Sequence, residues 1–144
     1  MIILKILLSY HVYNKVWGLA KNPFNPLKSC GGSSGGEAGL VATRCVPFGI
    51  GSDLGGSIRI PSEFNGVYGF KATSERVSKL GSRGIIDFSP LVSPGGRLKA
   101  TLGPIAGSID DVVLGMKVIF HPEAHYYDPF VAPIPFNQTL YASS

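Results

Sequence analysis

The chain has 144 residues, of which 44% are hydrophobic and 15% are charged, and its formal net charge is +4. This composition excludes a disordered chain, and the length allows one domain but not two of ordinary size. The basic residues form no run and no stripe interleaved with aromatics, so we expect no nucleic-acid partner. The two cysteines, Cys30 and Cys45, lack disulfide-scaffold or metal-site spacing and indicate a reducing, intracellular compartment.

The three histidines do not form a metal-ligand pattern. His121 and His125 flank Pro122, which breaks the helix that an i, i+4 ligand pair needs. His11 stands far from both in the sequence. The sequence therefore predicts no metal site, and we expect no cofactor.

The first residues, MIILKILL, are apolar but are interrupted by Lys5. They are too few to span a bilayer, and no small-residue cleavage site follows, so we expect a buried strand rather than an anchor or a signal peptide. Residues 1–20 are interpreted as one apolar strand or short helix followed by irregular chain. The prolines and asparagines of KNPFNPLKSC predict an extended loop.

Helical and strand patterns alternate after this loop. A helix is predicted over Ser34–Thr43 with Glu37 in its first turn, followed by a short buried strand at VPFGIGSD. GGSIRIPSEFNG predicts a loop that leads into a helix, with an apolar face and a glycine stop, and VYGFKAT predicts another strand. The residues of that face are Ile58, Ile60 and Phe64, and the stop is Gly66.

The C-terminal half contains one long aperiodic stretch, residues 74–100, and one well-marked helix. TLGPIAG predicts a strand before it, and SIDDVVLGMKVIF has Ser108 as the N-cap and Asp110 and Asp111 in the first turn. Its apolar side consists of Val112, Val113, Met116 and Ile119. The tail from His121 is proline-rich and aperiodic. The alternation of strands and helices predicts an α/β fold class.

The stretch SCGGSSGGEAGL concentrates glycine and serine immediately before the first predicted helix. The glycine spacing fits a phosphate-binding loop, but Glu37 stands where such a loop needs lysine. GIGSDLGG misses the dinucleotide fingerprint because Leu54 replaces its third glycine. A flexible linker is disfavoured because the glycines open directly into a helix.

A nucleophile elbow, G-x-S-x-G, matches at both Ser33 and Ser34. Such an elbow follows a buried strand, whereas a proline-rich loop precedes these serines. This alternative stays open, and it requires His121 or His125 to lie close to the serine.

Three motifs occur in a fixed order: GGSSGGE, GSDLGGSIRIP and GVYGFKAT. Together they resemble the amidase signature family, in which the corresponding motifs carry a Ser–Ser–Lys triad. Ala72 departs from the proline usual in the third motif. The resemblance covers residues 22–120 and extends more loosely to Ser144. It implies a partial amidase-signature fold, a mixed sheet with helices on both faces and incomplete at both ends.

This resemblance organises the chain as one partial domain, residues 1–144. It divides into a divergent N-terminal segment (1–21), a signature core (22–120) and a proline-rich tail (121–144). Within the core, it implies that Ser57 is the nucleophile and that Ser33, following a cis Gly32–Ser33 peptide, relays its proton to a neutral lysine. The amides of the Ser57 loop would form the oxyanion hole; they belong to Leu54, Gly55, Gly56 and Ser57.

Three further residues are interpreted as supports of this site. Asp53 and Arg59 flank Ser57 and are expected to fix its loop, because charges in such places usually pair. Ser34 is expected to add a hydrogen bond to the bridging serine. Glu37 is expected to fix the start of the first helix.

Glu37 and the tail DPFVAPIPFNQTLYASS resemble the fatty acid amide hydrolase branch more than the tRNA amidotransferase subunits. The implied partner is a small-molecule acyl amide. We expect an intracellular location, cytoplasmic or peripheral to an internal membrane, and membrane association is left open for the full-length protein.

The family's lysine precedes the first serine by several tens of residues, and only 32 residues precede Ser33. Lys5, Lys15, Lys21 and Lys28 do not stand in its motif. We therefore expect an inactive fragment that contains the central catalytic segment. A non-catalytic remnant and a subunit similar to the tRNA amidotransferases remain alternatives.

Overall fold

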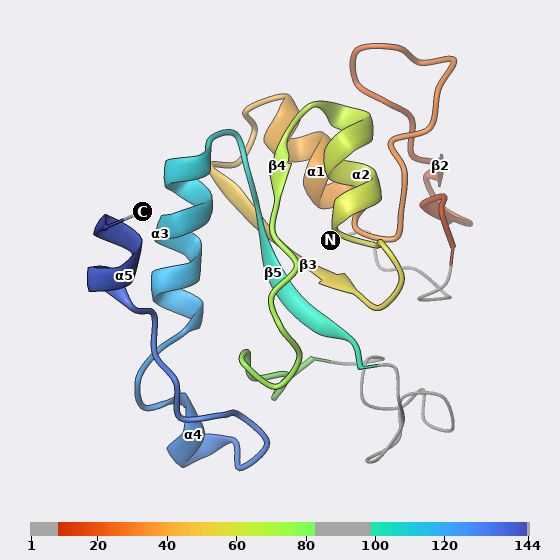
Figure 1. The fold of residues 1–144 in the computed structure, drawn as a ribbon. Coiled ribbons are helices and arrows are strands. Elements are labelled where there is room, and N and C mark those ends of the chain that lie inside the picture. The colour runs from red at the N-terminus through yellow and green to blue at the C-terminus, as the bar shows by residue number, and fades with distance from the viewer. Residues whose placement is uncertain (1–8, 83–98, 144) are drawn as a thin grey trace.

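The computed structural model describes residues 9–82 and 99–143, so the predicted N-terminal strand and most of the 74–100 stretch lie outside the described residues. Helices and strands alternate through the middle of the chain (Figure 1). The strands are β1 (Tyr13–Asn14), β2 (Gly18–Leu19), β3 (Phe48–Asp53), β4 (Tyr68–Gly69) and β5 (Thr101–Ala106). The helices are α1 (Gly35–Ala42), α2 (Arg59–Asn65), α3 (Ile109–Ile119), α4 (Ala124–Tyr127) and α5 (Gln138–Ala142).

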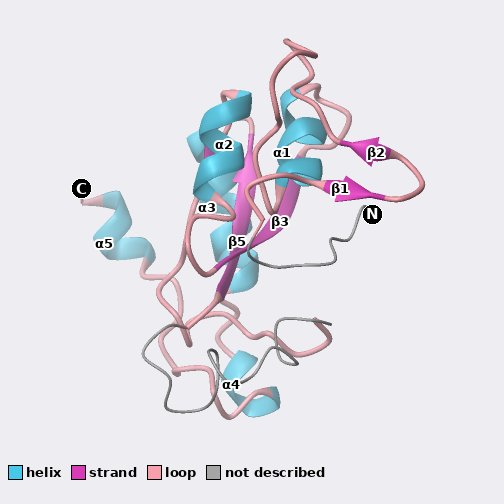
Figure 2. Ribbon diagram, turned by 90° about the vertical axis from the view of Figure 1, so that its right-hand side faces the viewer, coloured by secondary structure: helices cyan, strands magenta, loops and turns pink. Residues whose placement is uncertain are grey.

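The main sheet has the strand order β3-β5-β4 and lies between two helical layers. Helices α1 and α2 cover one face and α3 covers the other, as Figures 1 and 2 show from two directions. The predicted α/β class with helices on both faces is therefore confirmed. Among the described strands every pair is antiparallel, so the parallel pairing that a mixed sheet also contains is not seen in this part of the chain.

Strand β5 is the centre of the core because its alternate side chains face the two layers. Ile105 packs with Ala38 and Val41 of α1 and with Ile58, all of them buried. Leu102 packs on the opposite face against a second cluster that includes Met116 of α3. This alternation is the period-2 geometry of a strand. A central strand covered on both faces is buried along most of its length.

Two predicted patterns differ in detail from the structure. Strand β3 is present, but Phe48 and Ile50 are exposed, so only part of it is buried. The apolar face assigned to α2 was wrong at Phe64, which is 54% exposed. That helix instead buries Pro61, Ser62 and Asn65. The reason is tertiary, since Pro61 and Asn65 face the glycine-rich loop and Ser62 lies against Gly69 of β4, where no large apolar side chain fits.

Other local predictions are confirmed. Helix α1 occupies the predicted range, and α2 ends at Gly66, whose φ of +66° lies in the left-handed region that favours glycine. The side chain of Ser108 caps α3 by accepting a hydrogen bond from Asp111 N–H at 3.1 Å.

The segments at the two ends of the described chain have more structure than their patterns indicate. Residues 13–19 form a small hairpin, because Asn14 Oδ1 accepts the amides of Val16 and Trp17 and so closes the turn. In the tail, α5 begins where Asn137 caps Leu140 N–H. Both elements depend on single asparagine side chains, which a search for hydrophobic periodicity does not detect.

Among residues 9–82 and 99–143, none of the helices combines the length and apolarity that crossing a bilayer requires.

Gly103 provides a test of how closely β4 and β5 approach. A Cβ added at this residue would overlap the carbonyl oxygen of Phe70, whereas one added at Gly107 would meet nothing within 4 Å. We expect Gly103→Ala to lower the free energy of unfolding by about 2–4 kcal/mol, because backbone rather than a flexible side chain must move. Gly107→Ala is the matched control. Equal urea midpoints for the two variants would contradict this packing.

Candidate active site

The two serine-containing motifs meet at the beginnings of α1 and α2. Ser34, directly before α1, donates its backbone N–H to the carbonyl oxygen of Ser57 at 3.0 Å. Ser57 is 9% exposed and lies two residues before the start of α2, while Ser33 is half-buried. The structure therefore brings together the backbones of the two loops that the sequence singled out, although they are separated by α1 and β3.

The Gly32–Ser33 peptide bond is cis, as the resemblance implied. Gly32 is packed closely against the preceding chain, since a Cβ added there would lie 2.7 Å from the Ser9 carbonyl oxygen. Gly31 has a φ of +74°, and a Cβ on it would lie 2.9 Å from Pro61 Cα of helix α2. Both glycines are therefore needed for the backbone path that leads to Ser33.

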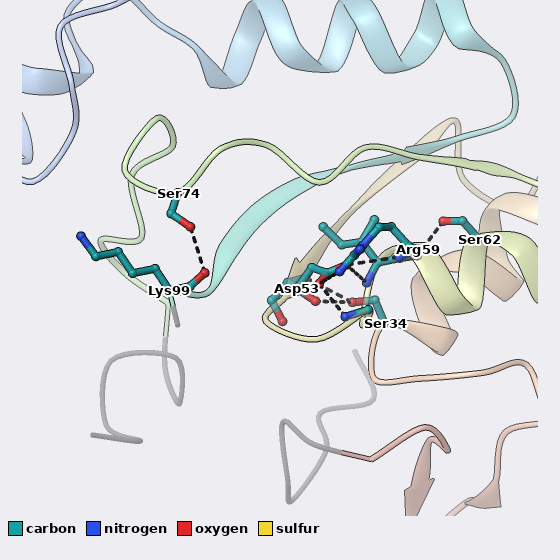
Figure 3. Close-up of polar contacts among 9 residues, drawn as sticks. Ser34, Asp53, Arg59, Ser62, Ser74 and Lys99 are labelled. Carbon is teal, nitrogen blue, oxygen red and sulfur yellow. Dashed lines mark hydrogen bonds and ion pairs between the residues drawn. The ribbon is translucent and has the colours of Figure 1, made fainter. Parts of the chain in front are cut away.

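A buried carboxylate, Asp53, organises the Ser57 loop. Its side chain has no exposed surface, and it accepts the backbone amides of Gly56 at 2.7 Å and of Ile58 at 3.1 Å. The Arg59 guanidinium donates to both of its oxygens, each at 3.0 Å (Figure 3). Asp53 thus lies at the N-terminal end of α2, where a negative charge is favourable. The interpretation of Asp53 and Arg59 as supports of the loop agrees with these contacts.

The hydrogen bonds to Asp53 determine its ionisation. Burial alone would raise the pKa of the carboxyl, but the hydrogen bonds from Arg59 and from the amides of Gly56 and Ile58 outweigh it and lower the pKa to about 2. The carboxylate is therefore charged at neutral pH, and the loop that it holds is fixed on both sides of Ser57.

The predicted oxyanion donors need one correction. Gly56 N–H donates to Asp53, so this amide is occupied and does not point to a substrate oxygen. In residues 9–82 and 99–143, the amides of Leu54, Gly55 and Ser57 donate to no protein acceptor. These three remain the predicted donors, and Gly56 is a structural residue of the loop.

Ser34 also has a different role from the predicted one. Its hydroxyl donates to the Ser52 carbonyl at 3.4 Å and accepts the Ser52 amide at 3.2 Å, so it contacts β3 rather than Ser33 (Figure 3). The side chain is buried, and it ties the start of α1 to the strand that leads into Asp53. In the described part of the chain, the hydroxyls of Ser33 and Ser57 have no protein hydrogen-bond partner, and their mutual approach stays a prediction.

Sequence reasoning missed Asn65, the last residue of α2. Its amide group donates to the carbonyl oxygens of Cys30 and Pro61, both at 2.7 Å, and so connects the helix after Ser57 to the loop before Ser33. Asn65 is 3% exposed. The sequence offered one signal for this role, because Asn65 is a polar residue at a position of α2 where an apolar residue is expected. Next to it, burial raises the pKa of the Cys30 thiol, which therefore stays protonated at neutral pH.

The nucleophile-elbow alternative is not supported by this arrangement. Ser33 follows the loop of residues 21–29 and not a strand of the main sheet. His125 belongs to α4 and His121 lies between α3 and α4, at the opposite end of the molecule from α1 (Figures 1 and 2). Within the described residues, no group of three His, Cys, Asp or Glu side chains is arranged to hold a metal ion.

The geometry agrees with comparisons to known proteins. The family model described as Amidase matches residues 4–143. The chain belongs to the amidase signature family. Its relatives include pig (Sus scrofa) fatty-acid amide hydrolase 1, 40% identical over 94% of this chain and 22% of that protein. Chicken (Gallus gallus) vitamin D3 hydroxylase-associated protein is 43% identical over 96% of this chain and 28% of that protein.

A solved structure of a fatty acid amide hydrolase is also similar, at 37% identity and a TM-score of 0.80. The match covers 92% of this chain and 22% of that one. The amidase chain described here thus spans between about a fifth and about three tenths of the length of these relatives. The residues matched by the family model, 4–143, include both serine motifs of this chain.

The hydrogen bonds to Asp53 make the stability of the amidase segment depend on pH. The pKa of Asp53 is about 2 when folded against an ordinary 3.8, so its stabilising contribution is complete above about pH 5 and is lost as the pH falls toward 2. We expect this contribution to be about 2 kcal/mol. Urea unfolding at pH 7, 5 and 3 measures it. Asp53→Asn should make the free energy of unfolding depend less on pH between 5 and 3. Asp110→Asn, which changes an exposed carboxylate, should leave the pH dependence of the wild-type chain unchanged. If Asp53→Asn loses as much unfolding free energy between pH 5 and pH 3 as the wild-type chain does, the assignment to Asp53 is contradicted.

Proposed function

We propose that this segment is the nucleophile-bearing part of a serine amidase in which Ser57 attacks the carbonyl carbon of an amide. The observation that carries the proposal is the Ser57 loop itself. Hydrogen bonds to Asp53 order this loop, and the Ser34 amide fixes the Ser57 carbonyl. The amides of Leu54, Gly55 and Ser57, which have no acceptor in the described part of the chain, are the proposed donors to the oxyanion. Preorganised amides of this kind stabilise the charge that develops on the carbonyl oxygen.

The chemistry divides into two steps. In the first, Ser57 Oγ forms a bond to the carbonyl carbon while its proton passes through the Ser33 hydroxyl to a neutral lysine. The C–N bond then breaks, and the leaving amine takes that proton. In the second step, water attacks the Ser57 ester, its proton following the same route, and the released carboxylic acid leaves Ser57 with its hydroxyl restored.

The substrate class is inferred from the relatives. The pig relative and the solved structure are both named as fatty acid amide hydrolases, and other relatives are named as acetamidases. The similarity to the solved fatty acid amide hydrolase, with a TM-score of 0.80, and the branch-like tail favour an amide of a long-chain acid. An intracellular location and a small-molecule partner are part of the same proposal.

The lysine is the component that these 144 residues do not provide in its motif. In the described part of the chain, Lys15, Lys21 and Lys28 are all exposed, and a lysine acts as a neutral base only when burial lowers its pKa. A non-catalytic remnant would share this feature. The two cases differ in whether Ser57 reacts once a lysine is supplied.

We therefore expect the 144-residue polypeptide, assayed alone, to hydrolyse a fluorogenic fatty acid amide at a rate close to the buffer background. Removing the general base from a serine nucleophile typically costs at least 10²-fold. The measurement compares the chain with a complete family member at equal concentration. Comparable turnover by the two would overturn the assignment of the missing base.

The second test identifies the nucleophile. The chain is extended with the lysine-bearing segment of a relative and treated with a fluorophosphonate, and the labelled peptide is mapped by mass spectrometry. Label is expected on Ser57, because this serine belongs to the same loop as the predicted oxyanion donors, the amides of Leu54 and Gly55. Ser57→Ala should abolish labelling, Ser33→Ala should slow it by about 10²-fold or more, and Ser82→Ala is the control. Label on Ser33 or Ser34 would refute the assignment, and no label on any serine would favour the remnant.

A further inference from the structure

His11 is a side chain that the proposed reaction does not use, yet it lies beside the loop that carries Ser33. Its ring Nδ1 is 3.0 Å from the Ser29 hydroxyl oxygen, eighteen positions away in the sequence. The contact forms with either neutral tautomer, because the Ser29 hydroxyl donates to a bare Nδ1, or an Nδ1–H donates to Ser29 Oγ.

Ser29 connects His11 to the glycine-rich loop that leads to Ser33. Its hydroxyl oxygen accepts the backbone N–H of Gly31 at 3.0 Å. Gly31 is the residue with the left-handed φ of +74°, one position before the Gly32–Ser33 peptide. A change in the Ser29 rotamer would therefore release the amide that holds Gly31 in this conformation.

The backbone around His11 touches the same loop directly. A Cβ added to Gly32 would lie 2.9 Å from His11 N, and His11 N–H in turn donates to the Ser9 hydroxyl at 3.2 Å. The next residue, Val12, is fully buried and packs close to Gly35 at the start of α1. The buried neighbour fixes where the His11 backbone lies, so the ring needs only its own side-chain torsions to reach Ser29.

We propose that His11 is a positioning residue that, through Ser29, holds the Gly31–Ser33 backbone in the conformation that the Ser33 relay requires. The link to the relay rests on the proposed function, whereas the His11–Ser29–Gly31 chain of hydrogen bonds does not. His11 touches no reacting atom in this scheme. Its effect is on the placement of Ser33, where a displacement of one ångström is enough to slow a reaction severely.

The first experiment uses the 144-residue chain labelled with ¹⁵N and measures hydrogen exchange at the Gly31 amide by NMR. We expect His11→Ala to raise the exchange rate by about 3- to 10-fold, the range that one net hydrogen bond supplies. His11→Asn should restore protection, because its side-chain amide carries both a donor and an acceptor near the position of Nδ1. His121→Ala is the matched control, since His121 Nδ1 also accepts one hydrogen bond, from Glu123 N–H, near α4.

A double-mutant cycle separates the proposed route from a direct one. If His11 acts through Ser29, the variant with both His11→Ala and Ser29→Ala should exchange at the rate of Ser29→Ala alone. If the rise in the Gly31 exchange rate in the double variant equals the product of the rises in the two single variants, His11 acts independently of Ser29 and the proposal is overturned. An exchange rate in His11→Ala equal to that of the His121→Ala control would also overturn it.

The second experiment measures fluorophosphonate labelling of Ser57 in the lysine-extended chain. We expect His11→Ala to slow labelling by about 3- to 10-fold and His11→Asn to restore it. Faster exchange at Gly31 with unchanged labelling would overturn the role in the reaction. If the parent chain itself fails to label, the proposed function fails, and the exchange experiment alone decides whether His11 positions the loop.

Discussion

The buried Asp53 carboxylate is the interaction on which the arrangement of the site depends. It stands at the end of β3, within the segment that pairs with β5, and it holds the first turns of the chain that becomes α2. A charge without exposed surface is tolerated only when its oxygens are satisfied, and here Arg59 and the backbone amides satisfy them. The sheet, the Ser57 loop and α2 are thereby fixed as one unit.

Close packing of side chains against the backbone of β3 is the second constraint, and it explains the glycine at position 51. Gly51 of β3 faces both the Ser34 hydroxyl and Ile58, each 2.8 Å from where a Cβ would stand. This contact lets the start of α1 rest directly on the strand. The serine side chain and the apolar core therefore meet at one residue, with no room for a larger side chain.

Polar side chains, rather than an apolar interface alone, join the two loops. Asn65 connects α2 to Cys30, Ser34 connects α1 to β3, and the backbone of Ser34 connects to Ser57. Such buried contacts are directional, and so they fix relative placement more narrowly than hydrophobic packing does. In this segment, that narrow placement holds the backbones of the Ser33 and Ser57 loops next to each other, which the proposed reaction requires.

The sequence by itself determined the elements whose causes are local. Helix α3 follows from Ser108 and its apolar face, the end of α2 from Gly66, and the family from three motifs in a fixed order. Only the tertiary structure decided that Gly56 N–H binds Asp53, that Ser34 contacts Ser52, and that α2 buries Asn65 instead of Phe64. These outcomes depend on which groups meet across the fold, and a hydrogen-bonding group is committed to a partner that no local pattern identifies.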